Sequence, residues 1–336
     1  MDLRFNALQT WLKTVLADTA INVQELANDA SFRRYFRAYS PDKTWVVMDA
    51  PPDLEATEPF IAIAKGFHQQ GLCVPEILAA DLSQGFLLLS DLGDDLYLRI
   101  LTPENAEYLY QTALNNVVII QTCKNITGWS LPHFDHNFMM SELENFQHWF
   151  LEKYLHLSLT TTEQDLLHNT FDALATKATN QPQVCVHRDY HSRNLLWLHN
   201  QNTLGILDFQ DAVWGPITYD IVSLLKDCYI NWPQSKVTEW LLFYYQQAQE
   251  KGLLDKTISI EKFVEWFDWM GIQRHLKAVF IFIRKLLRDD DPRYLTYIPR
   301  TLNYIQATVD NYPSLKGFAK LFNGLILSKV NERAIT

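Results

Sequence analysis

Three side chains in one stretch of the chain have the types and the spacing that phosphoryl transfer requires. Asp189 lies in a loop after a short apolar run, Asn194 follows five residues later, and Asp208 comes directly after a further apolar run. Phosphoryl transfer needs a carboxylate that orients the attacking hydroxyl and accepts its proton, and it needs oxygen ligands that hold Mg²⁺ on the phosphates. Asp189 suits the first task, and Asn194 and Asp208 suit the second.

The apolar runs predict how these side chains meet. Residues 184–186 read as a strand that delivers the loop with Asp189, and residues 195–207 read as strand, turn and strand. Such a hairpin brings Asn194 and Asp208 together although they lie fourteen positions apart. Either residue alone would be an ordinary turn or cap residue, but the joint pattern is hard to obtain by chance. We therefore favour the catalytic interpretation.

Length, charge and cysteines limit the class of protein. The chain has 336 residues, of which 48% are hydrophobic and 20% charged, and its net charge is −10. This length suits two domains, and the acidic balance argues against nucleic acid as a partner. The four cysteines form no zinc or disulfide pattern. No run approaches the ~20 apolar residues of a membrane span. We expect a cytoplasmic protein with no membrane partner.

The periodicity of apolar residues changes near residue 92. Before this point five runs read as strands, at 21–26, 32–39, 45–48, 76–81 and 86–89, and the first two of them alternate apolar and polar residues. After it helical patterns dominate, beginning with 103–123, 142–154 and 162–178. The sequence therefore predicts an α+β protein of two lobes. An antiparallel β-rich, nucleotide-binding domain covers residues 1–92, and a mostly helical domain with the catalytic loop, metal loop and substrate site covers 93–336.

The two loops resemble those of protein-kinase-like enzymes, and among these the aminoglycoside phosphotransferase family. Residues 187–194 match its H-x-D-x-x-x-x-N catalytic loop, residues 206–211 match its metal-binding loop, and Asp220 stands in its later D-x-x-x-L context. The resemblance implies a bilobal protein-kinase-like fold, ATP as the phosphate donor and Mg²⁺ as the metal. Asp208-Phe209-Gln210 has no glycine in third place, which distinguishes the chain from eukaryotic protein kinases.

A bacterial subgroup of that family gives a narrower resemblance. Residues 28–37, 48–52, 208–216 and 273–277 resemble the anomeric N-acetylmuramate/N-acetylglucosamine kinases of peptidoglycan recycling. This resemblance implies phosphorylation of the anomeric hydroxyl of a small-molecule amino sugar by ATP. We expect direct in-line transfer of the phosphate, while the oligomeric state stays open with a monomer slightly favoured. An aminoglycoside, choline or homoserine kinase of the same fold remains an alternative. A catalytically weak, kinase-like binding protein is an alternative of another class.

The expected nucleotide site departs from the usual kinase pattern. The first hairpin turn should cover the ATP phosphates, and it consists of Asn28, Asp29, Ala30 and Ser31, without the usual glycines. The third strand lacks the lysine that usually holds the phosphates. We expect Arg33 or Arg34 to replace it, with Arg34 narrowly preferred, since alternation lets only one of them face the nucleotide. Two solvent-facing arginines are the alternative, and Glu58 is a candidate partner.

Further side chains are expected around the adenine and the acceptor. The backbone of residues 88–93 should bind adenine, and this segment includes Ser90, Asp91 and Leu92. The expected substrate contacts are Arg188, Asp211, Trp214 and Arg274. Each has a plainer alternative: charge compensation for Arg188, a metal ligand or turn cap for Asp211, core packing for Trp214 and a packed helix face for Arg274. His187 and Asp220 are expected to brace the catalytic loop.

Overall fold

The computed structural model describes residues 2–26 and 32–335, and the chain divides into two compact units. The first unit comprises Met1–Ile100, Asn125–Ser130 and Asn194–Asp211, and the second comprises Leu101–Lys124, Leu131–Arg193 and Ala212–Thr336. The predicted boundary at residue 92 had assigned everything after it to the helical domain. The hairpin joins the first unit instead, because the N–H of Ile206 donates to the carbonyl of Cys73 at 2.9 Å.

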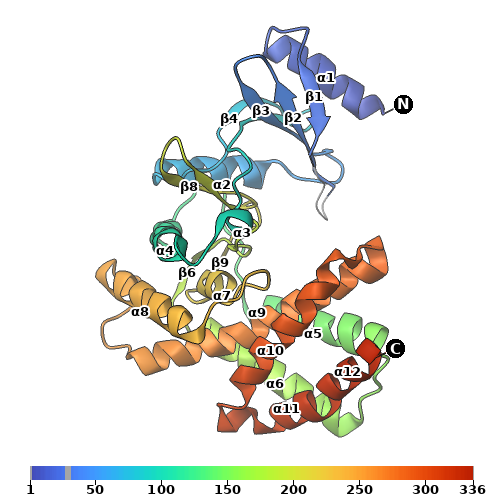
Figure 1. Ribbon diagram of the computed structural model, residues 1–336, viewed down its shortest axis with the longest axis vertical. Helices are drawn as coiled ribbons and strands as arrows, with labels where there is room; N and C mark the ends of the chain where they lie inside the picture. Colours follow the sequence, from blue (N-terminus) through green and yellow to red (C-terminus); the bar gives the residue numbers. More distant parts are fainter. Residues whose placement is uncertain (1, 27–31, 336) are drawn as a thin grey trace. The chain divides into compact units, whose positions relative to one another are not determined.

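An antiparallel sheet forms the centre of the first unit (Figure 1). Its strands, in spatial order, are β1 (Asn22–Glu25), β2 (Arg34–Tyr39), β3 (Thr44–Asp49), β5 (Phe86–Ser90) and β4 (Ile77–Asp81). Helix α1 (Leu3–Val15) covers one face by packing Leu8 and Leu12 against Phe36, Ala38 and Val47. The five predicted strands are confirmed.

A helix and a hairpin complete the first unit. Helix α2 (Glu58–Gln69) packs against Phe209, whose ring centroid lies 4.9 Å from that of Phe60 and 5.9 Å from that of Phe67. Phe209 follows the hairpin of β7 (Leu195–Leu198) and β8 (Thr203–Ile206), and a short helix α3 (Tyr97–Ile100) precedes the second unit. The predicted hairpin is therefore confirmed, and an aromatic cluster fixes its end.

The second unit is mostly helical. Its helices are α4 (Ala106–Thr122), α5 (His136–Phe146), η1 (Gln147–Tyr154), α6 (Thr161–Thr179), α7 (Tyr219–Leu225), α8 (Gln234–Glu250), α9 (Ile260–Asp289), η2 (Pro292–Tyr297), α10 (Ile298–Val309), η3 (Pro313–Leu315), α11 (Lys316–Leu321), η4 (Phe322–Ile326) and α12 (Leu327–Ile335). Helix α9 packs against α5, α6, α7 and α10, and its middle is buried. No helix of the described residues is long and apolar enough to cross a membrane. The four cysteines, all within the described ranges, are free.

Two features of this unit differ from the prediction. The helix expected at 142–154 begins at His136, where Asp135 caps it by accepting the N–H of Phe138 at 2.9 Å, and it continues as the π-helix η1. A strand β9 (Val213–Pro216), which we did not predict, pairs antiparallel with β6 (Gln183–Val186). Glycine and proline at its end weaken the strand pattern in the sequence.

Candidate active site

One buried carboxylate holds the loop that follows β6. Asp220 in the first turn of α7 is fully buried and accepts the N–H of His187 at 2.7 Å and that of Arg188 at 3.0 Å. The buried ring of His187 accepts the N–H of Asp189 at 3.3 Å. Arg188 has a φ of 76°, a conformation that costs free energy and persists only where the surroundings enforce it. Asp220 and His187 thus make the contacts that their expected bracing roles require.

Replacement of Asp220 with asparagine should loosen this loop. Burial raises the pKa of Asp220 to about 7, and the two N–H donors act in the opposite direction. An asparagine offers one acceptor oxygen and sets an amide N–H₂ against a backbone donor, which should cost about 1–3 kcal/mol of unfolding free energy. Thermal unfolding measures the loss. Asp211→Asn, an exposed carboxylate, is the control, and an Asp220→Asn variant as stable as the parent would contradict the bracing role.

Asp189 is an ionised carboxylate beside a buried arginine. Its side chain is 34% exposed, and its Oδ1 lies 3.7 Å from a terminal nitrogen of Arg274, which extends from α9. Burial alone would raise the pKa of Asp189, but the positive charges of Lys277 and Arg274 hold it well below its usual range. Because it is deprotonated at neutral pH, Asp189 can accept a proton from a hydroxyl group placed against it.

Arg188 points into the helical unit rather than offering its charge to solvent. Its guanidinium binds Oε1 of Glu142 at 2.8 Å and lies 5.1 Å from the ring centroid of Phe138. Glu142 also pairs with Lys277 at 3.4 Å and accepts from Gln273 at 3.0 Å. This cluster favours charge compensation over substrate binding for Arg188. No role could be predicted for Glu142 or Lys277, because only the fold brings their helices together.

A second carboxylate, which the sequence did not single out, holds the far end of the loop. Asp227 is 2% exposed and accepts the N–H of Ser192 at 2.9 Å and that of Tyr229 at 2.8 Å. The ring of His191 lies edge-on against Tyr229, at 5.2 Å between centroids. Asp220 and Asp227 therefore fix the backbone on both sides of Asp189.

The hairpin of the first unit brings Asn194 and Asp208 together, as their spacing predicts. Leu207 donates its N–H to the carbonyl of Asn194 at 2.9 Å, and the Asn194 side-chain nitrogen lies 3.3 Å from Oδ2 of Asp208. Gln210 donates to the other carboxylate oxygen at 2.8 Å. A carboxylate and a carboxamide side chain, each with an oxygen to offer, form a donor set that suits Mg²⁺, which takes few protein ligands when phosphates complete its shell. Their role as metal ligands remains a prediction.

Arg33 and Tyr35 share the surroundings of Asp208. Arg33 is only 11% exposed and pairs with Glu55 at 2.9 Å, so Glu55 rather than Glu58 is its partner. Burial raises the pKa of Tyr35; the negative charge of Asp208 adds to this effect, and the positive charge of Arg33 opposes it. Arg33 is therefore the arginine that lies near the expected metal ligands.

Arg34 lies on the opposite side of β2, and its placement argues against our preference for it as the phosphate ligand. It pairs with the fully buried Asp49 at 2.6 Å and also with Asp2, and its guanidinium lies 5.5 Å from the ring centroid of Phe36. Phe36 belongs to the face that α1 covers. Strand alternation predicts that the two arginines lie on opposite sides of the strand, and their different partners agree with this. The packing of α1 covers the side on which Arg34 lies.

The expected adenine segment is anchored by side chains. Ser90 accepts the N–H of Glu76 through its hydroxyl at 2.8 Å, and Asp91 pairs with Arg37 at 2.8 Å. Leu92 packs next to Gly205 of β8, where a Cβ would come within 3.2 Å of it. The segment thus has a fixed backbone, which recognition of a base by main-chain groups requires.

The remaining predicted residues are Asp211, Trp214 and the turn at 28–31. Asp211 is exposed and accepts from Gln210 at 3.3 Å. Trp214 is half-buried in β9, where it pairs with Cys185 and donates its N–H to the carbonyl of Pro132 at 2.8 Å. Its backbone is therefore structural. The predicted phosphate-covering turn, Asn28, Asp29, Ala30 and Ser31, lies outside the described residues.

Comparison with known proteins connects this arrangement to phosphotransferases. A family model described as the phosphotransferase enzyme family matches residues 22–255. The N-acetylmuramate/N-acetylglucosamine kinase of Pseudomonas aeruginosa is 40% identical and covers 96% of this chain and 97% of its own. The protein of the same name from Neisseria meningitidis serogroup B is 36% identical, with 98% of both chains covered.

Solved structures show the same fold at low identity. The ADP-bound aminoglycoside phosphotransferase APH(2'')-Ib superposes with a TM-score of 0.60 at 13% identity, over 96% of this chain and 99% of that one. Choline kinase LicA from Streptococcus pneumoniae gives 0.62 at 12% identity, over 90% and 99%. The expected protein-kinase-like fold class, with an antiparallel β-rich part before a mostly helical part, is confirmed.

Proposed function

The chain belongs to the phosphotransferase enzyme family, and we propose that it is a cytoplasmic kinase that transfers phosphate from ATP to the anomeric hydroxyl of N-acetylmuramate and N-acetylglucosamine. The setting of Asp189 supports this proposal more than any other observation. It is an ionised, partly exposed carboxylate on a loop that two buried carboxylates hold in place. Such a group can take the proton of an acceptor hydroxyl.

The reaction is a single in-line displacement. The hydroxyl proton of the sugar passes to Asp189, a bond forms between that oxygen and the γ-phosphorus, and the bond from phosphorus to the bridging oxygen breaks. The electron pair of the broken bond leaves on ADP. Asn194 and Asp208 would hold Mg²⁺, which neutralises phosphate charge when bound. No covalent phosphoenzyme is needed, because the acceptor oxygen itself attacks.

On the nucleotide, Arg33 takes the place of the usual lysine. Its planar guanidinium can bind two phosphate oxygens at once. The backbone of Ser90, Asp91 and Leu92 receives the adenine. This assignment depends on the position of Arg33 near Tyr35, whose pKa Asp208 also influences. Both arginines are ion-paired, Arg33 with Glu55 and Arg34 with Asp49, but Arg34 lies on the side of β2 that α1 covers.

Alanine at position 33 should therefore raise the KM for ATP. Loss of a charged hydrogen bond worth about 1.5–3 kcal/mol corresponds to an increase of roughly 10- to 100-fold. Arg34→Ala is the matched control: it should leave this KM nearly unchanged and lower the thermal stability instead, because buried Asp49 loses a partner. Initial rates at varied ATP concentration give the KM of both variants. A large KM effect of Arg34→Ala with none of Arg33→Ala would reverse the assignment.

A direct acceptor screen tests the proposed activity. The full chain is incubated with Mg·ATP and, in turn, N-acetylmuramate, N-acetylglucosamine, an aminoglycoside, choline and homoserine, and the phosphorylated product is identified by mass spectrometry and ³¹P NMR. We expect a sugar 1-phosphate from both amino sugars. Transfer only to an aminoglycoside, choline or homoserine would replace this proposal. The absence of transfer to any acceptor would favour a binding protein.

A further inference from the structure

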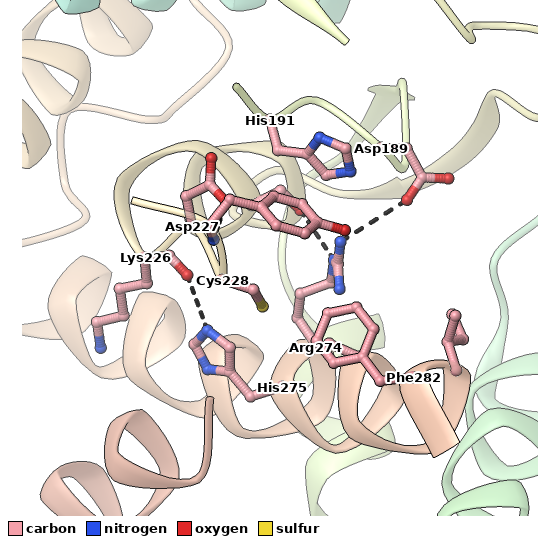
Figure 2. A pocket seen from close by; sticks show the side chains of 12 residues that line it. Asp189, His191, Lys226, Asp227, Cys228, Arg274, His275 and Phe282 are labelled. Atoms are coloured by element: carbon pink, nitrogen blue, oxygen red, sulfur yellow. Dashed lines mark hydrogen bonds and ion pairs between the residues drawn. The ribbon is translucent and has the colours of Figure 1, made fainter. Parts of the chain in front are cut away.

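A small cavity adjoins Asp189 within the helical unit (Figure 2). Its volume is about 60 Å³, and all of its lining residues belong to the second compact unit. Three of them, Arg274, Ala278 and Phe282, follow one another at four-residue spacing and thus form a row along one face of α9. Figure 2 shows Arg274 reaching from this helix toward Asp189, with His191 above.

Most charged groups around the cavity are already paired. Lys226 binds Asp268 at 2.9 Å, and Asp227 accepts the two N–H groups of the loop. His275 bonds to the carbonyl of Lys226 at 2.9 Å and stacks on Tyr304. These side chains hold the walls in place and are not available to recognise a ligand.

Two buried polar side chains keep unused hydrogen-bonding capacity. Arg274 is 7% exposed, and within the described residues its one side-chain hydrogen bond runs from Nε to Ser223 Oγ at 3.0 Å. Its terminal nitrogens therefore remain to donate, since the distance of 3.7 Å to Asp189 is too long for a hydrogen bond. His191 is 8% exposed, and its buried Nδ1 has no hydrogen-bond partner among the described residues. Buried polar groups usually have a hydrogen-bond partner. Because Arg274 and His191 line the cavity, a ligand in the cavity could provide one.

The rest of the cavity wall is apolar. Ala278 and Phe282 are buried, and the ring of Tyr229 lies 6.2 Å from that of Phe282. The occupant should therefore combine a hydrogen-bond acceptor with a small apolar end. A water molecule needs about 10–15 Å³ of space for its centre, so the cavity has room for a few waters or for one acetyl group.

We propose that this cavity receives the acetyl part of the substrate's acetamido group, with Arg274 donating to its carbonyl oxygen and Ala278 and Phe282 enclosing its methyl. The inference rests on the proposed function and specifies how that site selects its substrate. N-acetylglucosamine and N-acetylmuramate share this group on C2. They differ at C3, where muramate carries an ether.

The position of the cavity also limits which hydroxyl reacts. If the acetyl group lies beside Asp189, the reacting hydroxyl is on a carbon next to C2, namely C1 or C3. Muramate has no free hydroxyl on C3, so C1 is the one position that both sugars offer. Its O–H loses the proton to Asp189, the C1 oxygen binds phosphorus, and ADP leaves with the electron pair. The cavity thus gives a physical reason for an anomeric product.

A series of acyl groups tests the proposal on the full chain. N-acetylglucosamine, N-propionylglucosamine and glucose are compared by kcat/KM with Mg·ATP. Glucose should react at least about 100-fold less efficiently, because its C2 hydroxyl leaves the donors unpaired, and the extra methylene of the propionyl group should cost roughly 10- to 200-fold. Equal efficiency for the three sugars would overturn the acetyl cavity while leaving the kinase activity in place.

Enlarging the cavity should weaken the preference for the acetyl over the propionyl sugar. Ala278→Gly removes the methyl group that faces the acyl end. We expect the kcat/KM for the propionyl sugar, divided by that for the acetyl sugar, to rise about tenfold, because one methylene in an apolar pocket changes kcat/KM by at least this factor. Ala175→Gly, which removes a buried methyl from α6 away from the cavity, is the matched control and should leave the ratio unchanged. An unchanged ratio in Ala278→Gly overturns the proposal, because the ratio is measured within one active variant. Absence of transfer to every N-acetyl sugar would overturn the proposed function itself, and the cavity assignment with it.

Discussion

Replacement of Asp189 with asparagine is expected to lower kcat by about 10²- to 10⁴-fold, the contribution typical of a positioned general base. Asparagine keeps the shape of the side chain and its contact with the acceptor hydroxyl but cannot take the proton. Its neutral side chain no longer pairs with Arg274, which lies 3.7 Å from the carboxylate. Single-turnover phosphorylation of N-acetylglucosamine measures the effect directly.

ATP binding provides the control for this variant. Because Asp189 acts on the acceptor, the Kd for Mg·ATP should stay within about threefold of that of the parent, less than 1 kcal/mol. A thermal unfolding temperature close to that of the parent would exclude a folding defect. Near-normal turnover in Asp189→Asn would show that another group accepts the proton, and His191 would then be the next residue to test.

Asp208→Ala is expected to abolish Mg²⁺-dependent binding of ATP. The carboxylate is the charged member of the Asn194–Asp208 pair, and its loss should leave the metal site with a neutral amide. A drop of about 3 kcal/mol, roughly 100-fold in the Kd for Mg·ATP, is a minimum expectation for a lost charged ligand. Calorimetric titration with ATP, with and without Mg²⁺, separates the metal-dependent part of binding from the rest.

The comparison with Gln210 makes this test specific. Gln210 donates to Asp208 at 2.8 Å but offers no charge, so Gln210→Ala should weaken Mg·ATP binding far less than Asp208→Ala. If Asp208→Ala bound Mg·ATP as tightly as the parent, the metal would have to be held elsewhere. Equal losses in both variants would indicate that the position of the hairpin end, rather than the carboxylate charge, determines binding.

The sequence predicted those parts of the site that local spacing controls. Asn194 and Asp208 meet because a hairpin of predictable length closes between them, and the Leu207–Asn194 backbone bond shows this closure. Likewise, alternation correctly placed Arg33 and Arg34 on opposite faces. The face that is left open to the nucleotide was not predictable, because α1, a helix that ends well before these arginines in the sequence, covers the other face.

Other residues escaped prediction because their role exists only in the folded chain. Asp227 follows α7 without a motif, yet it binds the N–H of Ser192, thirty-five residues earlier. Glu142 lies on one helix and its partners Arg188 and Lys277 lie on a loop and another helix. Strand β9 was missed because Gly215 and Pro216 favour turns, and its pairing with β6 overrides that local preference.

The way in which Asp220 and Asp227 hold the catalytic loop affects how the loop can change in evolution. Both carboxylates accept hydrogen bonds from backbone N–H groups, which belong to His187, Arg188 and Ser192. Every amino acid except proline has a backbone N–H group. Apart from the ring of His187, which accepts the N–H of Asp189, this anchoring makes no demand on side-chain identity at these positions beyond the room available and the positive φ at 188. The side chains of the loop can therefore change, and bind other acceptors, while its backbone conformation stays the same. Proline at one of these positions would remove the N–H group that the carboxylate binds.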